Sequence, residues 1–85
     1  MTDKMYSQAE EIKVMIETIQ EEESLTEQEY IDRVVYHFRE EFSTVDDRLA
    51  VYMHLHKQER YGGNWYWLVR RIRNTGQVRR LAGLE

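Results

Sequence analysis

The 85-residue chain has no cysteine, no proline and only four glycines. Without cysteine it can form neither a disulfide nor a thiolate metal site, and the redox compartment leaves no mark on the sequence. Without proline, helices with short connections are favoured. A long apolar run is also missing. The longest stretch without a formal charge covers residues 61–69, far short of the roughly 20 residues of a transmembrane helix. We therefore expect no membrane-spanning segment.

A chain of this length buries enough surface for one modest core and not for two. We assign residues 1–83 to a single helical domain. The last two residues, Leu84 and Glu85, resemble the remnant of a cloning site ahead of an affinity tag, and we expect them to be non-native. The N-terminus lacks the basic head and apolar run of a secretory signal, so a cytoplasmic location is the default expectation.

Acidic and basic residues are separated along the chain. The formal net charge is −4, but residues 1–47 hold four Lys/Arg against fourteen Asp/Glu, and residues 48–85 hold eight against two. The two parts therefore carry −10 and +6. Such an asymmetry fits halves that neutralise each other in the fold, a basic half that binds a polyanion, or an acidic half that imitates one. Neutralisation between packed helices is the simplest of the three.

The spacing of apolar residues predicts helices, and no segment shows the two-residue alternation of a β-strand. We expect a first helix at about residues 3–22 with one apolar stripe. A second helix should begin after Thr26 and end near Phe42. Its start is the clearest local signal in the chain, because Thr26 and Glu29 have the spacing of a capping box.

The second half is expected to hold a third helix at about residues 45–60, stopped by Gly62 in the left-handed conformation. Its apolar residues cover roughly 200° of the helical wheel, so we expect it at the centre, with neighbours on two sides. Asn64 should cap a fourth helix at residues 65–73, and a last helical turn follows at residues 77–82. The predicted fold class is an all-α bundle of about four helices with a short C-terminal helical turn.

One face of the fourth helix is rich in aromatic and arginine side chains. The apolar residues of this helix share one side, which we expect to face the core. Trp67 then lies almost on the other side of the helix, and Tyr66 lies beside two arginines. Tryptophan, tyrosine and arginine are over-represented in interface hot spots. The sequence therefore predicts a module that binds another protein, with a second copy of the chain as one form of that partner. The expected contact residues are Tyr61, Tyr66, Trp67, Arg70, Arg71 and Arg73.

Two alternatives use the same residues. In a nucleic-acid-binding regulator, the arginines would neutralise phosphates, Tyr66 and Trp67 would stack on unpaired bases, and Arg79 and Arg80 would extend the basic surface. In the other alternative there is no ligand. Trp67 packs under a neighbouring helix, and the arginines reach the glutamates of the first helix.

Catalysis has little support in the sequence. His54 and His56 are two residues apart, so on a helix they point in different directions and cannot share a metal ion. His56 falls among the apolar residues of the predicted third helix. We therefore expect it to be a hydrogen-bonded residue at the boundary of the core. The pair Gly62 and Gly63 lacks the strand and the Lys-Ser/Thr sequence of a phosphate loop. We therefore expect a non-enzymatic protein with no metal, cofactor or small-molecule substrate.

Overall fold

The computed structural model describes residues 1–22 and 24–85. The described residues are 76% helical and include no strand, which confirms the predicted all-α class. The elements in chain order are α1 (Asp3–Gln20), α2 (Glu27–Glu41), α3 (Val45–His56), the 3-10 helix η1 (Glu59–Tyr61), α4 (Asn64–Asn74) and α5 (Val78–Ala82).

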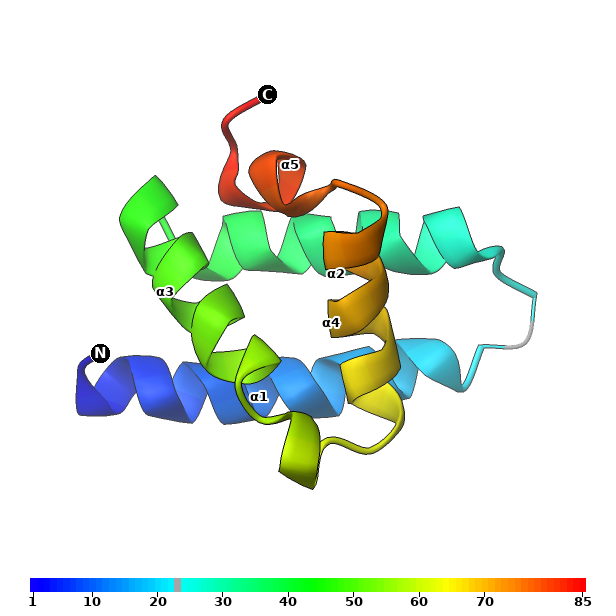
Figure 1. Ribbon diagram of the computed structural model, residues 1–85, viewed down its shortest axis with the longest axis horizontal. Coiled ribbons are helices and arrows are strands. Elements are labelled where there is room, and N and C mark those ends of the chain that lie inside the picture. The colour runs from blue at the N-terminus through cyan, green and yellow to red at the C-terminus, as the bar shows by residue number, and fades with distance from the viewer. Residues whose placement is uncertain (23) are drawn as a thin grey trace.

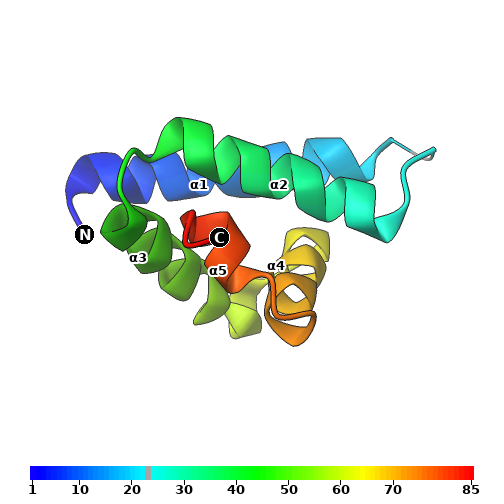
Figure 2. The ribbon, with the colours of Figure 1, turned by 90° about the horizontal axis from the view of Figure 1, so that it is seen from above.

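The helices lie in two layers. The antiparallel pair α1 and α2 forms one layer (Figure 1). The shorter helices α3, α4 and α5 cover one side of that pair (Figure 2). No described helix combines the length and the apolar character that a bilayer crossing requires.

The helix starts follow from local sequence. The hydroxyl of Thr26 accepts a hydrogen bond from the backbone N–H of Glu29 at 3.2 Å, and the carboxylate of Glu29 accepts one from the N–H of Thr26 at 3.1 Å. This is the predicted capping box, which satisfies two N–H groups that a helix start leaves free. Thr44 caps α3 in the same way, by accepting from the N–H of Asp47 at 3.1 Å.

The predicted end of α3 is wrong in two respects. The helix stops at His56, four residues early, and η1 follows as a separate 3-10 turn. Gly62 is extended, with φ −76° and ψ 131°, and is not a left-handed stop. It is required for another reason, because a Cβ built there would lie 2.4 Å from the Cβ of Tyr66. Close approach of η1 to α4, rather than a positive φ, therefore demands glycine.

The predicted cap of α4 is also wrong. Asn64 is the first helical residue, and Gly63 holds the cap position without a side-chain hydrogen bond. The long-range partner of this end is Gln20, whose Nε2 donates to the carbonyl oxygen of Asn64 at 2.9 Å. The start of α4 is therefore anchored on α1.

One apolar cluster runs through all five α-helices. On α1 the predicted stripe is buried through Ala9, Ile12, Ile16 and Ile19. α3 has neighbours on more than one side, as predicted, since it contacts α1, α4 and α5. It is not more central than α1, α2 or α4, because each of these also contacts three helices. Tyr52 of α3 is fully buried, and its hydroxyl donates to the carbonyl oxygen of Val69 at 2.6 Å. Burial raises the pKa of Tyr52 to about 12.

Arg48 holds the ends of two helices together. Its Nε donates to the carbonyl oxygen of Phe42 at 2.8 Å, and its Nη1 donates to that of Ala82 at 3.0 Å. A third bond, from Nη2 to the carbonyl oxygen of Arg39, is 3.3 Å long. The carbonyls at a helix end lack helical partners and carry partial negative charge. Arg48 therefore serves as a common C-terminal cap for α2 and α5.

Candidate functional site

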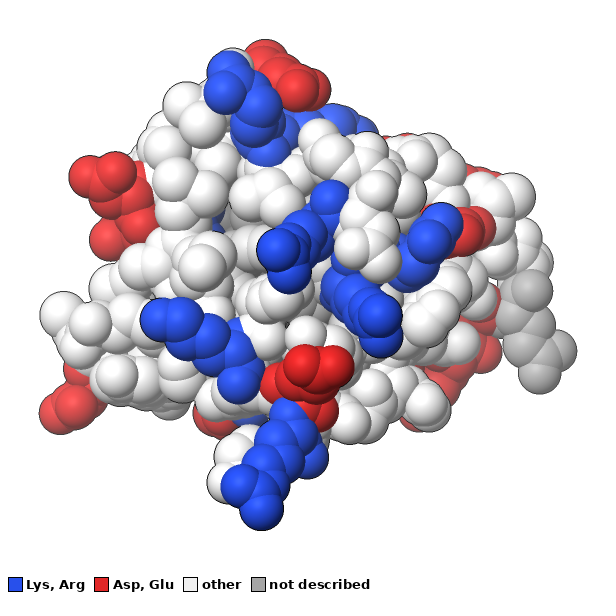
Figure 3. All heavy atoms as spheres, viewed as in Figure 1, with Lys and Arg blue, Asp and Glu red and all other residues white. Residues whose placement is uncertain are grey.

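The outer surface of the layer α3–α5 is basic. Figure 3 looks onto this layer and shows Lys and Arg side chains spread across it, with few acidic groups between them. This layer, residues 45–85, supplies eight basic residues and four acidic ones, Asp46, Asp47, Glu59 and Glu85. The separation of charge along the chain has therefore become a separation between the two layers.

Neutralisation between the layers is partial. Within the described residues, two ion pairs join them: Arg71 Nε to Glu27 Oε1 and Arg80 Nη1 to Asp32 Oδ1, each at 2.6 Å. A hydrogen bond from Gln28 lowers the pKa of Asp32, and Arg80 lowers it further. Arg71 and Arg80 thus do what the ligand-free alternative expects of the arginines, although their partners lie on α2 and not on α1.

Trp67 stands out on α4. It is 47% exposed, whereas its neighbour Trp65 is buried and has the Nζ of Lys13 5.0 Å from the centre of its ring. Arg70 lies one helical turn after Trp67 and makes no ion pair with any described residue. We call Trp67, Arg70 and Arg73 the α4 ridge. The ridge combines an exposed indole with positive charge that no carboxylate in the described chain neutralises.

Tyr66 does not belong to this surface, so its predicted place away from the core is wrong. Only 9% of it is exposed, and its hydroxyl donates to the carbonyl oxygen of His56 at 3.1 Å. Its ring also lies against those of His56 and Trp65. The physical reason is that α4 is covered on two sides, by α1 and by α3. A helical wheel shows the apolar side of one helix and cannot show a second neighbour.

A cleft of about 300 Å³ lies beside the ridge, lined by Tyr52, Met53, His56, Arg73 and Val78. Met53 is 50% exposed at its rim. Nη1 of Arg73 lies within hydrogen-bond distance of Nε2 of His56, at 3.3 Å. His56 is therefore the hydrogen-bonded boundary residue that the sequence predicts.

Met53 and Val78 were not predicted as site residues. Val78 gives no signal of a site, because a helix of five residues has no readable face. For Met53 the signal was present, since the apolar arc of α3 is wider than one core contact requires.

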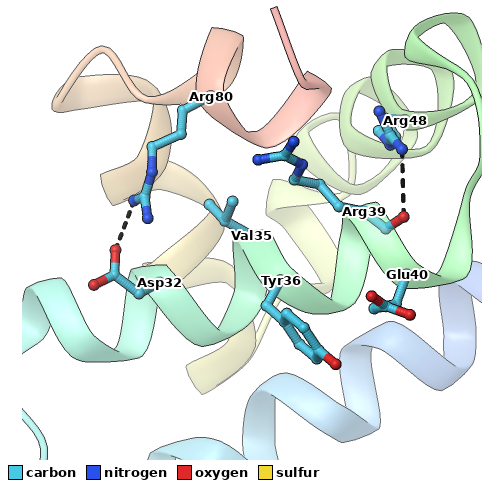
Figure 4. A pocket seen from close by; sticks show the side chains of 7 residues that line it. All are labelled: Asp32, Val35, Tyr36, Arg39, Glu40, Arg48 and Arg80. Carbon is cyan, nitrogen blue, oxygen red and sulfur yellow. Dashed lines mark hydrogen bonds and ion pairs between the residues drawn. The ribbon is translucent and has the colours of Figure 1, made fainter. Parts of the chain in front are cut away.

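The remaining predicted residues are dispersed. Tyr61 is 79% exposed on η1, and Arg79 is exposed on α5. Arg80 instead points into a groove of about 480 Å³ between α2 and α5 and reaches Asp32 there (Figure 4). Arg79 and Arg80 therefore do not act together as one basic surface.

The groove in Figure 4 has mixed charge. Two carboxylates and three guanidinium groups line it, and Arg48 and Arg80 are already bonded to protein groups. In the described part of the chain, no three His, Asp or Glu side chains come together in a way that would hold a metal ion. The surface that combines an exposed tryptophan, unneutralised positive charge and an adjoining cleft is the α4 ridge, and we take it as the candidate site.

The chain matches no protein-family model, no curated protein and no solved structure, so the function has to be inferred from its own residues.

Proposed function

We propose that this protein is a small non-enzymatic interaction module that binds another protein through the α4 ridge. The observation that carries the proposal is the exposure of nearly half of Trp67 on a helix whose other tryptophan is buried. An indole buried at the centre of an interface is the commonest kind of hot spot, and its truncation costs about 2 kcal/mol or more of binding energy.

The charge of the ridge indicates the chemistry of the partner surface. Arg70 and Arg73 have no carboxylate partner among the described residues. Arginine pairs with carboxylates through two parallel hydrogen bonds, which adds specificity to affinity. The cleft beside Arg73 has room for one apolar side chain between Met53 and Val78. We therefore infer a partner surface that presents carboxylates around an apolar group.

Nucleic-acid binding is less well supported. The burial of Tyr66 removes one of the two rings that the stacking hypothesis needs. Arg71 and Arg80 are neutralised by Glu27 and Asp32, which reduces the number of free phosphate contacts. The same observations take Tyr66 and Arg71 out of the predicted protein-contact set, but the proposal keeps Trp67, Arg70 and Arg73, which are exposed.

The test is affinity capture from an extract of the source organism with three immobilised proteins: wild type, Trp67→Ala and Tyr36→Ala. Tyr36 is the matched control, because it is an aromatic residue 60% exposed on the other layer. We expect a protein that wild type and Tyr36→Ala both retain and Trp67→Ala loses. Retention of the same proteins by all three would overturn the proposal.

A second measurement separates protein from nucleic acid. Labelled single- and double-stranded oligonucleotides are titrated with the protein at low and at physiological salt, and anisotropy is recorded. Phosphate binding weakens steeply with salt. Binding with such a slope that is lost in the variant Arg70→Ala/Arg73→Ala would replace the proposed function with the nucleic-acid one.

A further inference from the structure

The outer side of α1 is an acidic stripe with an apolar centre. Val14 is 64% exposed and lies directly opposite the buried stripe of the helix. Four exposed glutamates surround it, and we call these five residues the α1 stripe: Glu10, Glu11, Val14, Glu17 and Glu21. Of these four glutamates, only Glu10 makes an ion pair with a described residue, Lys13, at 2.8 Å. Most of the negative charge of this surface is therefore unneutralised.

The α1 stripe and the α4 ridge are complementary. Each has one exposed apolar side chain, Val14 or Trp67, and charge of one sign: glutamates on both sides of Val14, and Arg70 and Arg73 in the turns after Trp67. The acids of the stripe are the kind of partner inferred above for Arg70 and Arg73. Opposite surface potentials steer association and fix the orientation of docking.

Within one molecule the two surfaces approach each other at one end, where Glu17 and Glu21 line a cleft with Asn64, the first residue of α4. Val14, at the centre of the stripe, lies on the side of α1 that faces away from the core. α1 and α4 already pack against each other through their inner sides, where Gln20 bonds to Asn64 at 2.9 Å and Lys13 lies over the ring of Trp65. Their outer sides belong to different layers of the fold (Figure 2). A contact between Val14 and the α4 ridge must therefore form between two copies.

We propose that a second copy of this chain is the partner of the α4 ridge, and that the α1 stripe of one copy docks on the ridge of the next. This inference rests on the proposed function, because it names the partner of the same ridge. Each contact joins two different surfaces, so the copies associate head to tail, as a reciprocal pair, a larger ring or an open chain. The contact does not pair stripe with stripe or ridge with ridge.

The first experiment is sedimentation velocity of the wild-type protein over a range of concentrations at about 0.01 M and about 1 M salt, where the Debye length is roughly 30 Å and 3 Å. We expect the mean mass to rise with concentration at low salt and to fall to the monomer at high salt. A monomer at every concentration at low salt would overturn the inference.

The second experiment uses two variants that each lose one surface. Val14→Lys/Glu17→Lys removes the stripe and keeps the ridge, and Trp67→Glu/Arg70→Glu removes the ridge and keeps the stripe. Each is expected to be monomeric alone at low salt. An equimolar mixture retains one intact interface, so it should form a 1:1 dimer and nothing larger. A mixture that stays monomeric, or a variant that still self-associates alone, would contradict the head-to-tail arrangement.

A matched control has the same change in charge on α2. Tyr36→Lys/Glu40→Lys replaces an exposed apolar residue and a nearby glutamate, both outside the stripe and the ridge. It should associate as wild type does. Circular dichroism verifies that every variant keeps its helices, and Arg70→Glu alone takes the place of the ridge variant if that variant unfolds.

The two proposals fail separately. A monomeric wild type that still captures a Trp67-dependent protein would overturn only the self-association. Trp67→Ala keeps the α1 stripe and can still retain copies of this chain, so capture is judged on other proteins. A wild type that stays monomeric and captures no other protein in a Trp67-dependent way would overturn the proposed function.

Discussion

The hydroxyl of Tyr66 donates a hydrogen bond to the carbonyl oxygen of His56, and this bond joins α4 to the last residue of α3. The next residue, Trp67, points about 100° away around the helix and is 47% exposed. Two aromatic residues that are adjacent in sequence thus have opposite roles, one in the core and one on the surface.

The first prediction compares these two neighbours. Tyr66→Ala should lower the free energy of unfolding by about 3 kcal/mol, because it empties a buried site. Trp67→Ala should change it by no more than about 0.5 kcal/mol, as is typical of surface substitutions. Urea titrations followed by circular dichroism measure both. If Trp67→Ala were the more destabilising of the two, Trp67 would be a core residue and the α4 ridge would lose its anchor.

The second prediction concerns Gly62. Gly62→Ala places a methyl group 2.4 Å from the Cβ of Tyr66, so η1 and α4 must move apart, at a cost of about 1–3 kcal/mol. The neighbouring Gly63→Ala is the control, because the nearest atom to its Cβ is the Oε1 of Glu17 at 4.0 Å. Thermal unfolding of both variants gives the comparison. Equal stability of the two would show that the contact between Gly62 and Tyr66 is not close in solution.

The third prediction concerns Arg48. Arg48→Ala leaves the carbonyl oxygens of Phe42, Arg39 and Ala82 without their shared donor. We expect the free energy of unfolding to fall by about 2 kcal/mol. Arg48→Lys should recover only part of it, because an ammonium group cannot reproduce the planar fork of a guanidinium.

Arg39→Ala is the control for Arg48, since the Arg39 side chain makes no hydrogen bond or ion pair with the described residues. Urea midpoints of the three variants test the expectation. If Arg48→Ala were as stable as Arg39→Ala, the Arg48 side chain would not stabilise the ends of α2 and α5.

The fourth prediction concerns stability at high pH. The pKa of Tyr52 is raised to about 12 in the folded protein, mainly by burial. An unfolded tyrosine ionises near pH 10. The unfolded state therefore releases this proton first, so the stability that Tyr52 contributes is complete below pH 10 and is lost as the pH rises towards 12.

Urea titrations between pH 8 and about 11.5 should show this decline in the wild-type protein. Tyr52→Phe should make the decline shallower, because the residue that must ionise is gone. At neutral pH the same variant should have a free energy of unfolding about 1 kcal/mol lower than wild type, because it lacks the hydrogen bond to Val69. An unchanged slope in Tyr52→Phe would assign the alkaline transition to other groups.

Features that depend on a few neighbouring residues could be predicted from the amino-acid sequence. The capping box of Thr26 and Glu29 follows from a spacing of three, and the buried stripe of α1 follows from the helical period. The outward position of Trp67 on α4 also follows from the period, because its own helix has an apolar side opposite. Element type and the all-α class were therefore predictable.

The neighbours that each helix contacts on its second side became known from the folded structure alone. The wheel of α4 cannot show that α3 covers Tyr66, that Arg71 reaches Glu27, or that Gly62 is needed for close approach. Arg48 is a further case, since its carbonyl partners include Ala82, 34 residues away. These contacts depend on how the helices cross, and the crossing is set by side-chain packing summed over the whole core, which no local spacing encodes.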